Sequence, residues 1–127
     1  MSEEIRHQLA IGARRAMFLP AQVNREEAWH ILLTLAQCHA ERRAISISGA
    51  SCAAFVPETT GRRHVGLLVA EGLAERRPDP EDGRRHWIEI TEAGLSTVHR
   101  VLAVPEPVRA APAYRCSTNT GGDRRWA

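Results

Sequence analysis

The sequence predicts a mainly α-helical domain with one small β-hairpin wing, the arrangement of a winged helix-turn-helix. Three observations support this fold class. Apolar residues recur at helical spacing through several segments before residue 72, and a Gly-Leu pair then ends the helical pattern. Two short strand-like segments follow, on either side of a turn rich in proline, aspartate and glycine. The chain of 127 residues has room for one domain with a modest core.

The first part of the chain contains two expected helices. Residues 3–18 have apolar positions at helical spacing, and Leu19-Pro20 ends this segment because a residue before proline is pushed out of the α region. Asn24 is the expected N-cap of the next helix, residues 25–42. The apolar residues of that helix form a wide stripe, which predicts a buried face.

A short strand and a small helix are expected next. Alternating apolar and polar residues predict the strand at 44–47, and Ser48 is a suitable N-cap for a helix at 49–55. We assign residues 1–24 to an N-terminal helix and linker with a candidate role in dimerisation. Residues 25–103 are then the expected winged helix-turn-helix.

The helix predicted at 58–71 begins after a proline turn. Pro57 is expected at its first position, where the missing N–H costs nothing, and Gly72 is expected to end it in a left-handed conformation. Gly61 and Gly66 are poor helix formers inside it. Close approach to DNA, close approach to a neighbouring helix and simple tolerance all explain these two glycines.

The second half is expected to form a hairpin and a last helix. Residues 73–77 and 85–90 are predicted as strands joined by a long tip, because the residues between them are dense in turn formers. Thr91 is the expected N-cap of a helix at 92–103. Prolines and glycines interrupt residues 104–127, which we expect to lack packed structure.

The composition is that of a globular protein and is only mildly basic. The formal net charge is +2 and the sequence pI is about 8.7, so charge alone does not indicate nucleic acid. All basic residues are arginine, for which a GC-rich genome is the simplest explanation, yet arginine offers a planar fork that can bind guanine or phosphate in a bidentate manner. No apolar run approaches membrane-spanning length and the N-terminus lacks a signal-peptide core, so we expect a cytoplasmic protein.

The cysteines and histidines do not indicate a metal site, a cofactor or an enzyme. Cys38, Cys52 and Cys116 include no CxxC pair, and we expect Cys38 and Cys52 to be small core side chains. His39-Ala40-Glu41 lacks the Pro-Cys-x-x-Cys half of a zinc-deaminase signature. The segment 49–53 lacks the second glycine of a nucleophile elbow. We therefore expect no catalytic activity.

The helix at 58–71 carries the first group of candidate DNA-binding residues. Thr59 and Thr60 can donate hydroxyl hydrogens to phosphate near the free N–H groups of the helix start. Arg62 and Arg63 are candidates for bidentate contact with guanine. His64 can reach a phosphate or pack on the helix flank. The alternative for both arginines is a solvated helix face with weak salt bridges.

The predicted hairpin carries the second group. Arg84 and Arg85 are expected to face Arg76 and Arg77 across the strands, where four cations would repel one another. One interpretation is internal neutralisation by the acidic residues of the turn, which are Asp79, Glu81 and Asp82. The functional interpretation is that Asp82 holds one arginine while Arg84 reaches the minor groove or a phosphate.

Three motifs in these segments resemble the MarR family of bacterial transcription regulators. Asp82-Gly83-Arg84, with Ile90-Thr91 after five intervening residues, is similar to the wing signature of that family, with Ile in place of Leu. Residues 67–73 resemble its helix ending in Glu-x-Gly-Leu, and residues 91–94 its Thr-x-x-Gly helix start. The resemblance implies that the 58–71 helix reads DNA and that Arg84 contacts the minor groove. Two differences are the acidic Glu58 and a last helix that Pro105 cuts short.

Two functions are therefore expected from the sequence. The first is a sequence-specific DNA-binding transcriptional regulator that binds double-stranded DNA as a homodimer. The residues of its expected dimer surface either serve that purpose or pack within one chain; they are Ile5, Leu9, Gly12, Ala16, Leu95, Val98 and Leu102. The alternative is a winged-helix module that binds another protein, because this fold does not determine its function. The residues do not identify a small-molecule effector.

Overall fold

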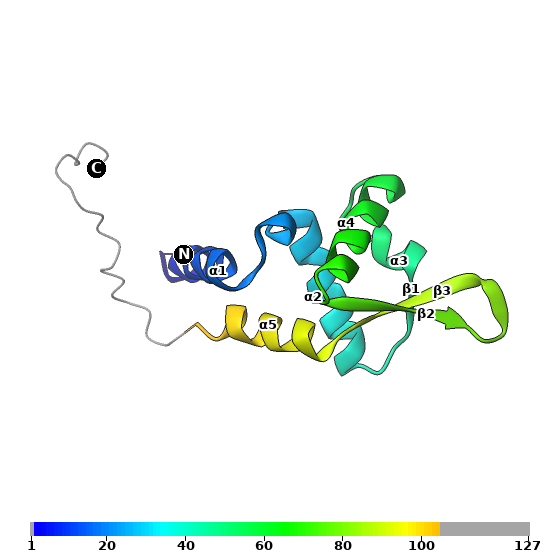
Figure 1. Cartoon of the computed structure of the whole chain (residues 1–127). Helices are drawn as coiled ribbons and strands as arrows, with labels where there is room; N and C mark the ends of the chain where they lie inside the picture. Colours follow the sequence, from blue (N-terminus) through cyan, green and yellow to red (C-terminus); the bar gives the residue numbers. More distant parts are fainter. Residues whose placement is uncertain (1, 105–127) are drawn as a thin grey trace.

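The computed structural model describes residues 2–104 and confirms the predicted fold class: mainly α-helical with a small antiparallel sheet (Figure 1). The tail predicted at 104–127 lies outside the described residues from residue 105 onward. The elements are α1 Ser2–Phe18, the 3-10 helix η1 Ala21–Val23, α2 Glu26–Ala40, β1 Ile45–Ser46, α3 Ile47–Ser51, α4 Glu58–Ala70, β2 Ala74–Asp79, β3 Asp82–Ile90 and α5 Glu92–Leu102.

The elements are arranged along an elongated molecule. Helices α1 and α5 contact each other at one end, α2, α3 and α4 form the middle, and the β2–β3 hairpin projects from the opposite end (Figure 1). The strands follow the order β1-β3-β2 and both pairings are antiparallel. The tip of the hairpin and α1 therefore lie at opposite ends, so they can contact different partners.

The hydrophobic core lies between α2, α4, α5 and the sheet. Ile31, Leu32 and Leu35 of α2 are almost fully buried, which confirms the apolar stripe predicted for this helix. Val65 and Leu68 of α4 pack against the same core. Burial of each such aliphatic side chain contributes about 1.5–3 kcal/mol, so α4 is anchored by its inner face and its outer face is left free.

Two predicted helix caps are wrong because other partners occupy their side chains. Arg25 precedes α2, and the amide oxygen of Asn24 instead accepts a hydrogen bond from Arg15 Nε at 3.2 Å. Ser46, not Ser48, caps α3 by accepting from the Gly49 N–H at 3.0 Å. α3 ends at Ser51, well before the predicted residue 55.

The two ends of α4 were predicted with different success. Pro57 is its N-cap residue, with φ −56° and ψ 148°, and so stands one position before the predicted one. Gly72 has the predicted left-handed conformation, with φ +78°. Close approach to α3 explains Gly61, because a Cβ there would lie 1.8 Å from the carbonyl oxygen of Ser51. A Cβ at Gly66 would meet nothing within 4 Å, so packing does not explain this glycine.

The hairpin is longer and its turn is tighter than predicted. Asp79 pairs with Asp82 across the ladder, so the turn consists of Pro80 and Glu81 alone. Arg76 faces Ile88 and Arg77 faces Trp87. The expectation that Arg84 and Arg85 face these two arginines is therefore wrong, because both lie nearer the tip.

The last helix begins where it was predicted. The Thr91 hydroxyl accepts a hydrogen bond from the Gly94 N–H at 3.0 Å, which confirms Thr91 as the N-cap of α5. The same hydroxyl donates to the carbonyl oxygen of Gly72 at 2.7 Å. The Thr91 N–H donates to the carbonyl oxygen of Leu73 at 3.0 Å. One residue thus joins the start of α5 to the end of α4.

Candidate nucleic-acid interface

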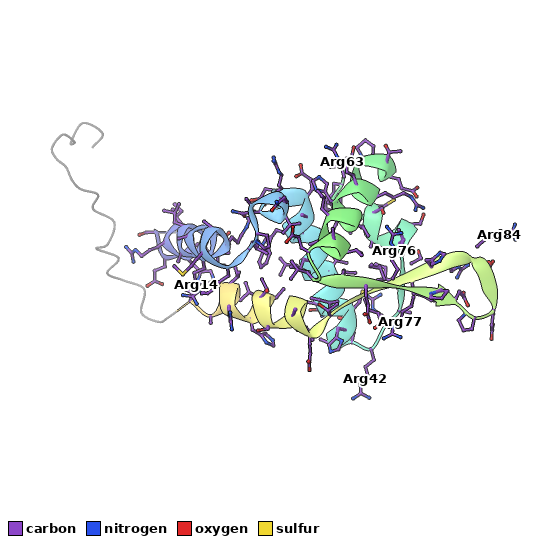
Figure 2. All side chains as sticks on the ribbon, viewed as in Figure 1. Arg14, Arg42, Arg63, Arg76, Arg77 and Arg84 are labelled. Atoms are coloured by element: carbon purple, nitrogen blue, oxygen red, sulfur yellow. The ribbon has the colours of Figure 1, made fainter. Side chains whose placement is uncertain are left out.

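The outer face of α4 is exposed and carries Thr59 and Arg63. An α-helix turns about 100° per residue, so Arg63 lies about 160° from the buried Val65. Both Thr59 and Arg63 are exposed, whereas Thr60 is half-buried on the flank. Figure 2 shows Arg63 pointing away from the body of the protein. Among residues 2–104, Arg63 has no carboxylate oxygen within 4.0 Å.

The start of α4 can attract an anion. The first N–H groups of an α-helix have no partner within the helix, and the helix dipole places partial positive charge there. Pro57 provides no side-chain hydrogen bond to these groups. They are therefore available to a phosphate oxygen.

Glu58 holds Arg62 in a defined position on the flank of α4. Its Oε2 accepts hydrogen bonds from Arg62 Nε and from the Ser48 hydroxyl, each at 2.9 Å. Arg62 Nη2 lies 2.8 Å from the same oxygen. The Ser48 hydroxyl and then the Arg62 guanidinium lower the pKa of Glu58 from its ordinary value of 4.5. The salt-bridge alternative considered for the two arginines thus describes Arg62 and not Arg63.

His64 packs between α4 and α2. Its side chain is 13% exposed and its Nε2 lies 3.9 Å from Glu27 Oε1. Its Nδ1 has no hydrogen-bond partner in the described part of the chain. Of the two options considered from sequence, the structure places His64 on the helix flank.

The tip of the wing presents Arg84 to solvent. The Arg84 side chain is 95% exposed, and Figure 2 shows it pointing outward from the end of the hairpin. Asp82 Oδ1 accepts a hydrogen bond from the Arg84 N–H at 3.0 Å and lies 3.7 Å from Arg84 Nε. Arg85 lies over the indole ring of Trp87, with Cζ 5.4 Å from the ring centroid.

Arg77 of β2 is neutralised by other acids than those predicted. Arg77 Nη2 lies 3.1 Å from Glu75 Oε2, and Arg77 Nε lies 2.9 Å from Glu89 Oε2. The acids of the strands, not those of the turn, therefore balance this cation. In Figure 2, Arg76 and Arg77 leave β2 toward opposite sides.

An open hollow of about 550 Å³ separates the wing from α3 and α4. Three arginines and one aspartate line it, together with residues near the start of α3 and one histidine of β3; the set is Ser46, Ile47, Ser48, Arg62, Asp82, Arg84, Arg85 and His86. Sequence analysis missed Ser46, Ser48 and His86. The only sequence signal for them was their proximity to the predicted strand and wing, and their convergence depends on the pairing of β1 with β3.

Comparison with known proteins supports the same architecture. No protein-family model matches this sequence. The HTH-type transcriptional repressor IacR of Pseudomonas putida is 34% identical over 76 residues, which are 60% of this chain and 43% of IacR. The chain thus matches less than half the length of that repressor.

Solved structures extend the likeness to most of the described chain. S. aureus MepR in a DNA-binding conformation has a TM-score of 0.58 and 21% identity, covering 76% of this chain and 67% of MepR. A MarR mutant from E. coli complexed with operator DNA has a TM-score of 0.55 and 19% identity, covering 79% of this chain and 67% of that chain. The chain has the MarR-like winged helix-turn-helix fold. In this MarR-like fold, α3 and α4 are the helix-turn-helix and β2–β3 is the wing.

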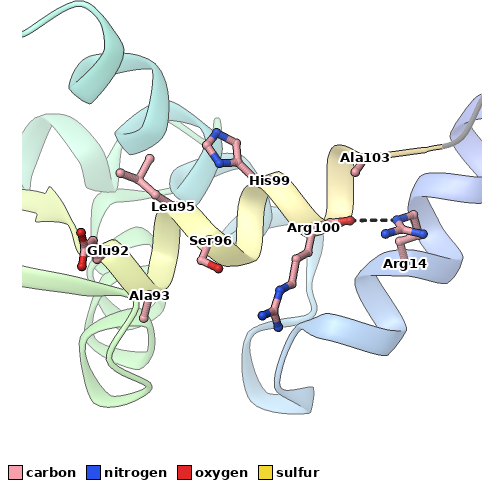
Figure 3. Close-up of a pocket in the computed structure, with 8 residues that line it drawn as sticks. All are labelled: Arg14, Glu92, Ala93, Leu95, Ser96, His99, Arg100 and Ala103. Atoms are coloured by element: carbon pink, nitrogen blue, oxygen red, sulfur yellow. Dashed lines mark hydrogen bonds between the residues drawn. The ribbon is translucent and has the colours of Figure 1, made fainter.

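The other end of the MarR-like fold is formed by α1 and α5. Arg14 Nε of α1 donates a hydrogen bond to the carbonyl oxygen of Arg100 at 2.8 Å (Figure 3). The guanidinium carbons of Arg14 and Arg100 lie 5.2 and 5.9 Å from the Phe18 ring centroid. A shallow hollow of about 730 Å³ runs along α5 beside Arg14. These contacts fix α1 on α5.

The remaining sequence predictions concern cysteines, metals and membranes. Cys38 is buried as predicted, whereas Cys52 is exposed, so the prediction of a core side chain is wrong for Cys52. Residues 2–104 contain no group of three or more His, Cys, Asp or Glu side chains that could hold a metal ion. Within the same range, no helix has the length and apolarity to cross a bilayer.

Proposed function

We propose that this chain is a sequence-specific DNA-binding transcriptional regulator that acts as a homodimer. The observation that supports it most directly is the exposed face of α4 beside a wing whose tip presents Arg84, 95% exposed. A helix of this kind fits the major groove, and a cationic wing fits the adjacent minor groove. The likeness to IacR, a transcriptional repressor, supports the same proposal.

The proposed contacts divide between helix and wing. Thr59 and Thr60, with the free N–H groups of α4, bind phosphate, and Arg63 reaches a base edge. Arg84 enters the minor groove. Arg62 and Arg85 complete the cationic surface between helix and wing. We leave His64 out of the contact set because its side chain is occupied between α4 and Glu27.

The homodimer is proposed from an apolar surface on α1. This helix contains no buried residue, and Ile5, Leu9 and Met17 are 53%, 63% and 68% exposed. Leu102 at the end of α5 is 44% exposed. A second copy is the simplest partner for this surface, because the two-fold symmetry of DNA half-sites requires two reading helices. Val98, expected to contribute, is buried inside the chain.

Two features of the sequence favour the protein-binding alternative, Glu58 and the modest net charge of +2. The negative charge of Glu58 would repel phosphate at the start of the reading helix. Glu58 contacts Arg62 and Ser48, however, so an adjacent cation offsets its charge. We therefore propose no second function.

Mobility shifts across a salt series test the proposal with duplex DNA from upstream of the chain's own gene. Arg63→Ala should weaken specific binding by about 1–3 kcal/mol, the value of one bidentate guanine contact. Arg84→Ala should also weaken it. Arg42→Gln is the matched control, because Arg42 follows α2 and points to solvent on the side of the molecule opposite to Arg63 (Figure 2). Affinity for the upstream DNA no better than for random DNA would reject the function.

A further inference from the structure

The hollow between α3, α4 and the wing has the chemistry of an anion site. Arg62, Arg84 and Arg85 line it, against one carboxylate, Asp82, which is already engaged with Arg84. Its floor also includes Ser48, whose hydroxyl donates to Glu58. Glu58 pairs with Arg62 beside the hollow, so three cations stand against two acids, and the remaining positive charge favours an anionic occupant.

The position of the hollow identifies the anion. If α4 occupies a major groove and the wing the adjacent minor groove, the strand that separates these grooves must pass between them. The hollow lies at that place, since Arg62 of α4 and Arg85 of β3 line it together. We propose that it seats a phosphodiester group of the DNA backbone, held by Arg62 and Arg85, with Glu58 as the residue that positions Arg62. This inference rests on the proposed DNA-binding function.

Helix geometry separates the role of Arg62 from that of Arg63. At about 100° per residue, Arg62 lies about 60° from the buried Val65, on the flank of α4, and Arg63 lies about 160° from it. Arg63 therefore faces the groove floor, where base edges lie. Arg62 faces the wing and the hollow, where the backbone would lie. The two adjacent arginines thus have different targets.

Glu58 prepares Arg62 for this contact. The guanidinium has five N–H donors; Glu58 Oε2 accepts the one on Nε and lies 2.8 Å from Nη2. The donors on Nη1 and Nη2 remain for a bidentate contact with one phosphate. A side chain that is already ordered loses less conformational freedom on binding. Ser48 holds the other side of Glu58 and so connects α3 to this arrangement.

The wing side of the hollow is also ordered before binding. Arg85 lies over Trp87, which limits the positions of its guanidinium. Asp82 fixes the backbone at Arg84 by accepting its N–H. His86 of β3 lines the same hollow.

Double-mutant cycles between protein and DNA test the inference. The operator, first located by binding-site selection from random DNA, is synthesised with a neutral methylphosphonate at one backbone position at a time. At one position in each half-site, the methylphosphonate should weaken wild-type binding by about tenfold. The methylphosphonate at that position should have little further effect on the affinity of Arg62→Ala or Arg85→Ala, because these variants have already lost the phosphate contact. Glu58→Gln should reduce the coupling at that position.

Arg63→Ala is the matched control, since it changes the neighbouring arginine of the same helix. It should keep the full effect of the methylphosphonate and should relax base preference at one position of the selected site. Arg62→Ala should weaken binding to all sequences alike and lower the salt slope by about 0.9. Coupling of Arg62 and Arg85 to different phosphates, or base-specific loss in Arg62→Ala, would overturn the inference. Failure of the wild-type chain to select any DNA would instead overturn the proposed function.

Discussion

Alanine at two glycines of α4 should change stability in opposite directions. At Gly61, the added Cβ would lie 1.8 Å from the Ser51 carbonyl oxygen, 2.6 Å from its carbon and 2.8 Å from its Cα. Real Cβ atoms essentially never approach closer than 3.0 Å, so α3 must move by about 1.2 Å, the difference between 3.0 and 1.8 Å. Backbone atoms cannot rotate away as a flexible side chain can. Overpacking of this kind costs about 1–3 kcal/mol, and the helix preference of alanine returns only about 1 kcal/mol.

Gly66 provides the matched comparison within the same helix. A Cβ there meets nothing within 4 Å, so Gly66→Ala should stabilise the protein by up to about 1 kcal/mol through helix propensity alone. For a domain of about 100 residues, 1 kcal/mol moves the Tm by roughly 4–8 °C. Thermal unfolding followed by circular dichroism should therefore place Gly61→Ala below wild type and Gly66→Ala above it. Equal Tm values for the two variants would refute the close approach of α3 to α4.

Three further predictions concern strain, pH and assembly. Arg42 has φ +57° directly after the end of α2, so Arg42→Gly should raise stability in urea unfolding by about 1 kcal/mol, whereas Arg42→Ala should not. Ser48 and Arg62 lower the pKa of Glu58 in the folded protein. The ionised Glu58 should therefore stabilise the fold above its unfolded pKa, and this stabilisation should be lost as the pH falls through its folded pKa. The unfolding free energies of Glu58→Gln and wild type should then converge as the pH is lowered below 4.5, and a constant difference would contradict this sign. Leu9→Glu should give a folded monomer in analytical ultracentrifugation, because Leu9 is 63% exposed; an unchanged mass would remove α1 from the interface.

The fold could be predicted because its signals are local. The apolar stripe of α2 and the left-handed Gly72 at the end of α4 both follow from short stretches of sequence. The N-cap of α2 could not, because Asn24 is a good cap by type and its amide oxygen is occupied by Arg15 of another helix. Tertiary contacts of this kind leave no periodic trace in the sequence.

The candidate site was predictable by residue type more than by geometry. Arg62 and Arg63 are adjacent and identical in chemistry, and only the contacts of Glu58 with Ser48 and Arg62 distinguish them. The wing arginines were assigned the wrong neighbours because strand register depends on where the turn lies, and the turn is two residues long. His64 required the position of α2, which sequence spacing does not provide.

The hydrogen bonds of Thr91 have a consequence for the spacing at which two copies would bind DNA. Its hydroxyl and N–H join the Gly72–Leu73 segment, where α4 has just ended, to the first turn of α5. α1 in turn is fixed on α5 by Arg14. The end that carries the proposed dimer surface and the helix that carries the proposed reading surface are thus connected by hydrogen bonds through α5. In the proposed homodimer, a tilt of one α5 against its counterpart would change the separation of the two reading helices, and with it their match to half-sites about 34 Å apart.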